Sequence, residues 1–398
     1  MGLSPDFSSM VTLCRAAMLV CLFLGSSLFL PGQDSLRISL LSCSPGAELY
    51  SIFGHSAIRV TDEASGTDRV YNYGTFNFRE KNFYLKFLSG KLNYYLSVQS
   101  FPSFMSDYLE ENRTVYEQVL NISHFYKLQL HTALRLNALP ENRAYKYDFF
   151  WDNCSTRIRD KIESSYADSL IYLPTPGVTF RDYLHQYLVH NPWSAFGIDL
   201  ILGLPADKGT GPREAMFLPL EMMKVFETAR VDGQAVCSPA EIILPAQPLS
   251  ESKSWFQPTW TFLLLLAVTA MAFLWFPSTG ASKFIANLLF ISAGLAGLLI
   301  GFLWFIADHT TTDYNYHFLW ANPLCLLYPW RRRLFSEKTN FIISFLYVLI
   351  LLLLIPGTLF LPQSLPVPCI FIWLALLLVL LPELKGRGRL RPDLISHQ

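Results

Sequence analysis

The sequence predicts an α+β domain followed by a helical bundle that crosses a membrane, and two observations support this division. The composition is too apolar for an ordinary soluble protein, because 52% of the 398 residues are hydrophobic and only 16% are charged. Strand and helix patterns fill residues 34–250, whereas long apolar runs fill residues 251–398. Lys plus Arg and Asp plus Glu balance at 31 each, so the charge does not favour a nucleic-acid partner.

Residues 1–33 are typical of an export segment. Arg15 precedes an apolar stretch of signal-peptide length, and a Pro-Gly pair then breaks the helical pattern. We expect cleavage near Gly32 or Gln33, with an uncleaved anchor helix as the alternative because the small-x-small cleavage pattern is not clean. In both cases the chain from about residue 34 onward lies outside the cytoplasm.

Residues 34–250 are predicted to form one mixed domain. Alternating apolar and polar residues between turn-forming segments predict strands, and longer helical patterns predict helices. The predicted strands are Leu36–Leu40, Ala57–Val60, Val70–Tyr73 and Val115–Leu120. The predicted helices are Phe101–Asn112, Phe125–Ala138 and Asn153–Ser164. A stretch rich in Pro and Ser, residues 239–258, is the predicted linker to the membrane.

Residues 251–398 are predicted to contain about five transmembrane segments. Three apolar runs are long enough to cross a core of ~30 Å at ~1.5 Å per residue. These runs are Thr259–Phe276, Phe284–Ala307 and Phe341–Leu361. Two shorter runs contain proline and are marginal spans or re-entrant pieces, Tyr314–Trp330 and Pro366–Leu381. Five spans that start from an external domain would place every cluster of positive charge in the cytoplasm. These clusters are Lys283, Arg331–Arg333 and Lys385–Arg391.

A histidine and a cysteine about a hundred residues apart give the strongest indication of chemistry. A free thiol has a pKa of about 8.5 and needs a base such as His55 to become a nucleophile. Cys154 opens a predicted helix, whose N-terminus favours the thiolate. Asn72 on the next strand would orient the imidazole, with Tyr73 as its competitor. The order His then Cys, with Asn153 before the cysteine, is that of circularly permuted papain-like folds. The alternative is a purely structural thiol and imidazole.

The three cysteines expected in the exported domain are Cys43, Cys154 and Cys237, out of seven in the chain. In an oxidising compartment an odd number leaves at least one thiol unpaired, unless it pairs with another chain. Cys43 and Cys237 could bond to each other and leave Cys154 free. Connectivity cannot be deduced from the sequence alone.

Several arginines and one polar loop are further candidates for binding. Arg59, Arg157 and Arg159 could hold a phosphate or lipid headgroup, although such arginines are usually solvated or salt-bridged. The loop Asp308–His317 follows a predicted span and faces the same side as Cys154 in the predicted topology. It could line a substrate entrance through His309, or be an ordinary hydrophilic hairpin. Its spacing of acidic and histidine residues matches no strong metal signature, so we expect no metal and no cofactor.

Three segments around these residues resemble the Lnb family of lipoprotein N-acyltransferases. They are Leu49–Val60, Val70–Phe76 and Tyr145–Arg157. Members of the family also have an exported domain ahead of several membrane helices, so the resemblance extends over most of the chain. It implies a circularly permuted papain-like domain in the periplasm, followed by a helical transmembrane bundle in the bacterial inner membrane.

The resemblance also implies a reaction. A fatty acyl group would move from a membrane phospholipid to the α-amine of the N-terminal cysteine of a lipidated lipoprotein. His55 would deprotonate Cys154, the thiolate would attack the phospholipid ester, and backbone N–H groups would stabilise the oxyanion. The amine would then attack the thioester. The catalytic residues would be Cys154, His55 and Asn72. The expected substrate contacts are Arg59, Asn153, Arg157 and His309.

Two other functions fit the same residues. The first is a papain-like peptidase or amidase that cuts cell-wall peptides, which would have little need for several membrane spans. The second is a membrane-anchored binding or assembly protein in which Cys154 and His55 are only structural. Alkylation by a thiol reagent separates these, because a buried structural cysteine should resist the reagent.

Overall fold

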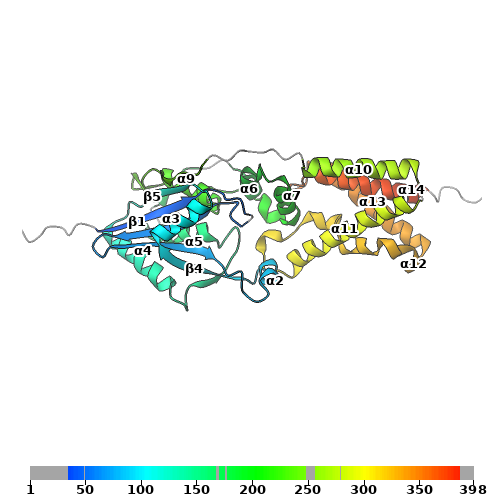
Figure 1. The fold of residues 1–398 in the computed structure, drawn as a ribbon. Coiled ribbons are helices and arrows are strands. Elements are labelled where there is room, and N and C mark those ends of the chain that lie inside the picture. The colour runs from blue at the N-terminus through cyan, green and yellow to red at the C-terminus, as the bar shows by residue number, and fades with distance from the viewer. Residues whose placement is uncertain are drawn as a thin grey trace, which may run out of the picture.

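The computed structural model describes residues 35–48, 50–166, 170–174, 177–247, 256–277 and 279–385. A sheet-rich N-terminal domain and a helical bundle lie end to end, which gives the molecule an elongated shape (Figure 1). The predicted export segment, residues 1–33, and nearly all of the predicted basic tail, residues 385–391, lie outside the described part of the chain. The predicted α+β domain and helical C-terminal region are confirmed.

The N-terminal domain is built on a seven-stranded antiparallel sheet with the strand order β10-β5-β1-β2-β3-β4-β6. Its strands are β1 (Leu36–Cys43), β2 (His55–Asp62), β3 (Thr67–Thr75), β4 (Asn93–Ser100), β5 (Val115–Val119), β6 (Ala144–Lys146) and β10 (Glu241–Leu244). All four predicted strands are present. Three of them extend beyond the predicted limits because neighbouring strands prolong their pairing, whereas β5 ends at Val119, one residue before the predicted limit.

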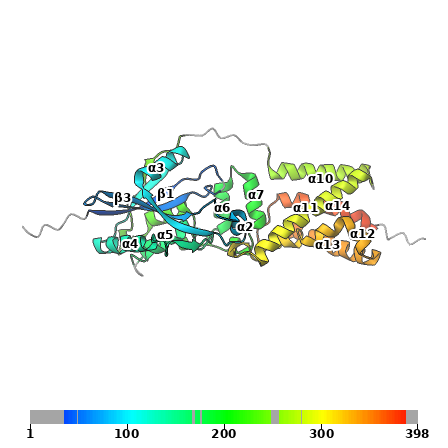
Figure 2. The same cartoon turned by 60° about the horizontal axis from the view of Figure 1, so that its bottom comes forward.

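Helices cover both faces of this sheet, as Figure 2 shows. On one face lie α4 (His124–Asn137), α5 (Cys154–Glu163) and α9 (Pro219–Thr228), and on the other lies α3 (Phe101–Glu110). Alternate residues of β1 divide between the two faces. Ile38 packs with the α5 side chain Ile158 in one core, whereas Leu41 packs with the α3 side chain Phe104 in another. The period of two along a strand explains this division.

Smaller elements complete the N-terminal domain. They are α2 (Phe83–Leu88), α6 (Phe180–Leu188), α7 (Pro192–Ile201), η2 (Leu204–Asp207), α8 (Pro212–Ala215) and the three-stranded sheet of β7 (Leu170–Ile171), β8 (Arg230–Val231) and β9 (Gln234–Ala235). A third core joins α6 to the segment before α5, where Phe150 stacks on Phe180 with ring centroids 4.5 Å apart. This core holds the loop that leads to Cys154.

The bundle consists of α10 (Pro258–Trp275), α11 (Gly280–Phe305), α13 (Glu337–Gly357) and α14 (Pro368–Lys385), with short elements η3 (Thr310–Thr312), η4 (Tyr316–Leu319), η5 (Pro323–Trp330) and α12 (Arg331–Leu334). In the described residues, α10, α11 and α13 are long and apolar enough to cross a membrane, and α14 contributes a shorter apolar stretch. Residues 314–330, predicted as a marginal span or a re-entrant piece, form 3₁₀ turns packed against α11. Pro329, inside η5, contributes to this because proline removes a backbone donor. The total of about five spans stays a prediction.

The loop after α11 connects the bundle to the N-terminal domain by backbone hydrogen bonds. Gly203 N donates to Thr311 O at 2.9 Å, and Leu204 N donates to Asp313 O at 3.1 Å. The side chain of Asn315 donates to Leu200 O at 2.9 Å. The two parts are therefore joined by more than the covalent linker.

Candidate active site

Asn153 fixes the start of α5, the helix that begins at Cys154. Its Oδ1 accepts hydrogen bonds from Ser155 N at 2.8 Å and Thr156 N at 3.0 Å. The Thr156 hydroxyl accepts from Asn153 N at 2.7 Å, which completes a capping box. The helix therefore starts at a defined residue, with Cys154 at its first position.

The side-chain nitrogen of Asn153 also makes hydrogen bonds inside the protein. Its Nδ2 donates to Phe149 O at 2.7 Å and to Phe217 O at 2.9 Å, and the residue is buried. This burial and these four hydrogen bonds give Asn153 a capping role, and its predicted contact with substrate stays a prediction. Spacing alone could not separate these two roles.

Cys154 lies where β2 and β3 part. The pairing of these strands ends at Ile58 and Tyr71, although both strands continue beyond that pair. Burial raises the pKa of the Cys154 thiol, and the backbone amides of Ser56 and Ser155 oppose the rise. These amides therefore lie near the sulfur.

Two glycines allow the backbone to approach this point. Gly74 has φ of 85°, and a Cβ on it would lie 3.3 Å from the Cβ of Cys154. Gly54 has φ of 83°, and a Cβ on it would lie 2.6 Å from the carbonyl oxygen of Cys43. Only glycine adopts such conformations without strain. Gly54 therefore allows the sharp turn by which the chain enters β2 at His55.

His55 is the first residue of β2, and Asn72 of β3 contacts its ring. The distance between His55 Nε2 and Asn72 Oδ1 is 3.4 Å, so Nε2–H donates to the amide oxygen. Burial and the charge of Arg113 lower the pKa of His55 to about 4. The imidazole is therefore neutral near pH 7, with Nδ1 as the atom that can accept a proton. Tyr73, the competitor, donates to Asn137 instead, at 2.6 Å.

The structure places His55 and Cys154 on neighbouring segments without a hydrogen bond between them among the described residues. Ser56 links the two: it follows His55 in β2, its amide faces the sulfur, and its hydroxyl lies 3.2 Å from that of Ser155. Transfer of a proton from the thiol to the imidazole therefore requires the two side chains to approach each other. Catalytic hydrogen bonds are often long before substrate binds.

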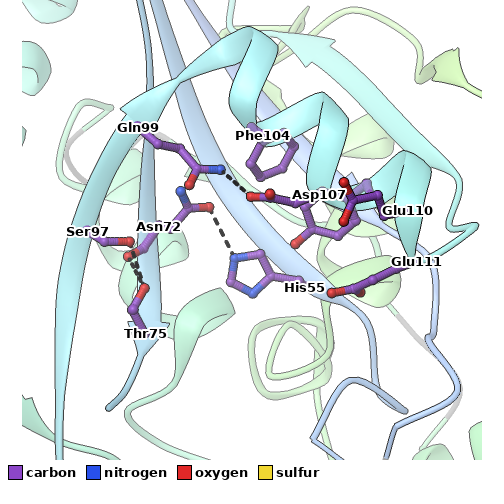
Figure 3. A pocket seen from close by; sticks show the side chains of 10 residues that line it. His55, Asn72, Thr75, Ser97, Gln99, Phe104, Asp107, Glu110 and Glu111 are labelled. Atoms are coloured by element: carbon purple, nitrogen blue, oxygen red, sulfur yellow. Dashed lines mark hydrogen bonds between the residues drawn. The ribbon is translucent and has the colours of Figure 1, made fainter. Parts of the chain in front are cut away.

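His55 and Asn72 open into a pocket of about 360 Å³ (Figure 3). Its remaining walls come from β3, β4 and α3: Thr75, Ser97, Gln99, Phe104, Asp107, Tyr108, Glu110 and Glu111. Cys154 is not among the residues that line this pocket. The α3 wall was not predicted as part of the site. Its amphipathic helix pattern has no feature that would have indicated a role.

The predicted binding arginines all have partners within the protein. Arg59 pairs with Asp68 and Glu117 at 2.7 and 3.2 Å and lies over the ring of Phe101. Arg157 is closer to Cys154 and pairs with Asp152 at 2.5 Å. A contact of either arginine with substrate stays a prediction.

Arg159, the third arginine, pairs with Asp160 at 2.8 Å and donates to Arg213 O at 3.0 Å. The bond to Arg213 O holds α5 against the segment that contains Arg213, whereas the pair with Asp160 lies within α5. The residue therefore supports the helix of Cys154 from its middle.

His309 lies in the loop after α11, on the N-terminal domain. Its Nε2 donates to Phe87 O at 3.1 Å, and the neighbouring Thr310 hydroxyl donates to Asp148 Oδ2 at 2.6 Å. Asp148 in turn accepts from the amides of Phe150 and Trp151, in the loop that leads to Cys154. The loop after α11 therefore contacts the turn at Asp148 that precedes Cys154, not the thiol itself. Among the described residues, no cluster of His, Cys, Asp and Glu could hold a metal ion.

All cysteines in the described part of the N-terminal domain are free thiols. Cys43 is buried in the core under α3, whereas Cys237 is buried in the core under α5. The sheet separates them, so the disulfide that we considered between them does not form. Cys154 is the one of the three that is not fully buried.

Two family models match this chain. The Lnb N-terminal periplasmic domain matches residues 32–186, which contain His55, Asn72 and Cys154. The Lnb transmembrane domain matches residues 250–384. No curated protein and no solved structure matches the chain.

Proposed function

Because the chain belongs to the Lnb family, we propose that it is a membrane-bound lipoprotein N-acyltransferase that uses Cys154 as its nucleophile. The observation that supports this best is the environment of Cys154. Its sulfur lies at the first residue of α5, faces backbone amides, and neighbours a neutral histidine that is held by Asn72. These are the parts that an acyl-thioester mechanism needs.

The first half of the proposed reaction loads the enzyme. His55 Nδ1 takes the thiol proton, and the thiolate attacks the carbonyl carbon of a phospholipid ester. The backbone amides of Ser56 and Cys154 act on the thiol and would donate to the oxyanion of the tetrahedral intermediate. The carbon–oxygen bond then breaks, and the imidazolium returns its proton to the leaving lysophospholipid.

The second half transfers the acyl group. The uncharged α-amine of the lipoprotein's terminal cysteine attacks the thioester carbonyl, His55 accepts the amine proton, and the carbon–sulfur bond breaks. The proton then returns to the sulfur, so the thiol is restored and no cofactor is consumed. A thioester reacts with amines more readily than an ester does, which gives a reason for a cysteine here.

The proposed location follows from the two family domains. The chain is a membrane protein with a periplasmic region. We place it as a multi-pass protein in the bacterial inner membrane, where the acyl donor and the lipid-anchored acceptor share one plane. We also propose that the N-terminal domain is a circularly permuted papain-like fold, which the cysteine at the start of α5 and the histidine and asparagine on β2 and β3 support.

The test is complementation. Cells that lack lipoprotein N-acylation would express the full chain, Cys154→Ala, His55→Ala or the control Cys237→Ala, a buried thiol away from the site. Mass spectrometry of a reporter lipoprotein's N-terminal peptide measures acylation. We expect acylation with the unmutated chain and the control, and none with the two site variants at equal protein levels.

Three results would contradict this proposal. Full acylation by Cys154→Ala or His55→Ala would remove that residue from the mechanism. If the unmutated chain produced no acylation but released peptides from cell-wall material, the papain-like peptidase would replace the acyltransferase. Neither acylation nor peptide release by the unmutated chain would favour the binding protein.

A further inference from the structure

Helix α2 presents large apolar side chains to its surroundings. Tyr84 is 82% exposed and Leu85 is 60% exposed, and Phe78 and Phe87 are also exposed. We call these four residues the α2 surface. Only Phe83 of this helix is buried in the domain core. Such a group of exposed aromatic and aliphatic side chains indicates an interaction site.

Contacts with the end of α11 fix the position of this surface. Asp308 N donates to Ser89 O at 2.9 Å, and His309 Nε2 donates to Phe87 O at 3.1 Å. The membrane helix α11 ends at Phe305, and three residues span at most ~11 Å. Figure 1 accordingly shows α2 beside that end of α11. Since a spanning helix ends near the boundary of the hydrocarbon core, α2 lies at the level of the headgroups.

The basic side chains around α2 are of the kind expected at the level of the headgroups. Arg79, Lys81 and Lys91 are exposed beside the α2 surface, and Lys86 pairs with Glu80 at 2.6 Å. Aromatic rings together with lysine and arginine are typical of segments that lie in the membrane interface. The basic side chains can bind lipid phosphates while the apolar ones enter the acyl boundary.

Aromatic contacts run from α2 toward the thiol. Phe83 stacks with Phe76 at 5.8 Å between ring centroids, and Phe76 contacts Tyr94 at 5.3 Å. Tyr94 stacks with Tyr147 at 4.4 Å. Phe76, Tyr147 and Cys154 all pack against the same core. A chain of aromatic contacts therefore leads from α2 to Tyr147, in the core against which Cys154 also packs.

We infer that the α2 surface lies in the phospholipid headgroup layer on the periplasmic side and guides the lipid acyl ester along this chain of aromatic contacts toward Cys154. The contact with the bilayer follows from position, exposure and charge. The guidance of the donor rests on the proposed acyl transfer. The α2 surface would thus be the donor entrance, on a segment that the membrane loop holds in place.

Photo-crosslinking tests the bilayer contact without using activity. The full chain, in its native membranes, would contain benzoylphenylalanine in place of Tyr84, or of Phe125 as the matched control. Phe125 is an aromatic residue 65% exposed at the start of α4, which lies at the far end of the domain in Figure 1. Leu295, exposed in the middle of α11, is the positive control.

We expect phospholipid adducts, detected by mass spectrometry, at positions 84 and 295 but not at 125. Adducts at 295 with none at 84, equal adducts at 84 and 125, or a protein adduct at 84 would each overturn the bilayer contact. A second measurement tests guidance: Leu85→Asp should reduce the hydroxylamine-sensitive acyl group on Cys154 by about tenfold, whereas Phe125→Asp should leave it unchanged.

The second measurement separates the two proposals. Lipid adducts at 84 with an unchanged acyl group in Leu85→Asp would refute guidance and leave the bilayer contact standing. Lipid adducts at 84 with no acyl group even on the unmutated Cys154 would refute the proposed function, and guidance with it.

Discussion

Replacing Asn153 with alanine should destabilise the N-terminal domain by removing four hydrogen bonds at once. The two bonds to Oδ1 cap α5, and loss of such a cap costs about 1 kcal/mol. The two bonds from Nδ2 satisfy the carbonyls of Phe149 and Phe217, and each lost bond to a buried carbonyl costs about 1 kcal/mol. The free energy of unfolding should therefore fall by about 3 kcal/mol.

Urea titration of the purified full chain in detergent, followed by a brief protease pulse, measures this change. The surviving N-terminal domain is quantified at each urea concentration, and the midpoint should fall by about 1 M or more. Asn153→Ser, which keeps a cap acceptor, should lose about 2 kcal/mol. Asn121→Ala removes an exposed side-chain bond to Ala235 O and should change the free energy by less than about 0.5 kcal/mol.

A loss of under about 0.5 kcal/mol in Asn153→Ala would refute the reasoning. It would mean that water or another donor replaces the amide, and that the start of α5 does not depend on this cap. An equal loss in Asn153→Ser and Asn153→Ala would assign the whole effect to the two carbonyls rather than to the cap.

Three further predictions use the same titration. Gly74→Ala should destabilise the N-terminal domain more than Gly66→Ala does. Both glycines have positive φ, but only a side chain at position 74 would approach Cys154. Equal losses of unfolding free energy would show that backbone strain alone decides the effect. The pKa of His55 is lowered from 6.5 to about 4, so its neutral form stabilises the domain above pH 6.5 and this contribution is lost as pH falls through 4. In His55→Gln the urea midpoint should therefore depend less on pH between 4 and 6.5. An unchanged pH dependence of the midpoint would contradict the low pKa. Arg181→Ala should lower the free energy of unfolding by about 3–5 kcal/mol, because it leaves the buried Asp199 and Asp207 without this arginine. Arg213 is 49% exposed, so Arg213→Ala should lower it by at most about 1 kcal/mol. Similar losses in the two variants would refute the role of burial.

Much of the local structure was predictable because it depends on neighbours in sequence. The polar run before Cys154 predicted a helix that starts at this residue, and the capping box explains why. Alternation predicted that Asn72 lies on the strand after that of His55, and the contact at 3.4 Å followed from that placement. The three longest apolar runs predicted α10, α11 and α13 within a few residues.

Other features depended on segments far apart in the chain. The bond from the Asn153 amide to Phe217, 64 residues later, was not predictable from the sequence. Cys43 and Cys237 looked like a possible pair until the sheet was found between them. Nothing in the sequence indicated that α3 forms a wall of the His55 pocket, because that depends on which face of the sheet the helix covers.

The sequence by itself determined the division into an α+β domain and an apolar bundle, the start of α5, and the pair His55 and Cys154 as candidates. Periodicity, capping and composition act over a few residues, so a single chain displays them directly. Only the tertiary structure decided that the loop after α11 contacts both Asp148 and α2. The hydrogen bond between Phe87 and His309 joins residues 222 positions apart, and no local pattern encodes such a contact.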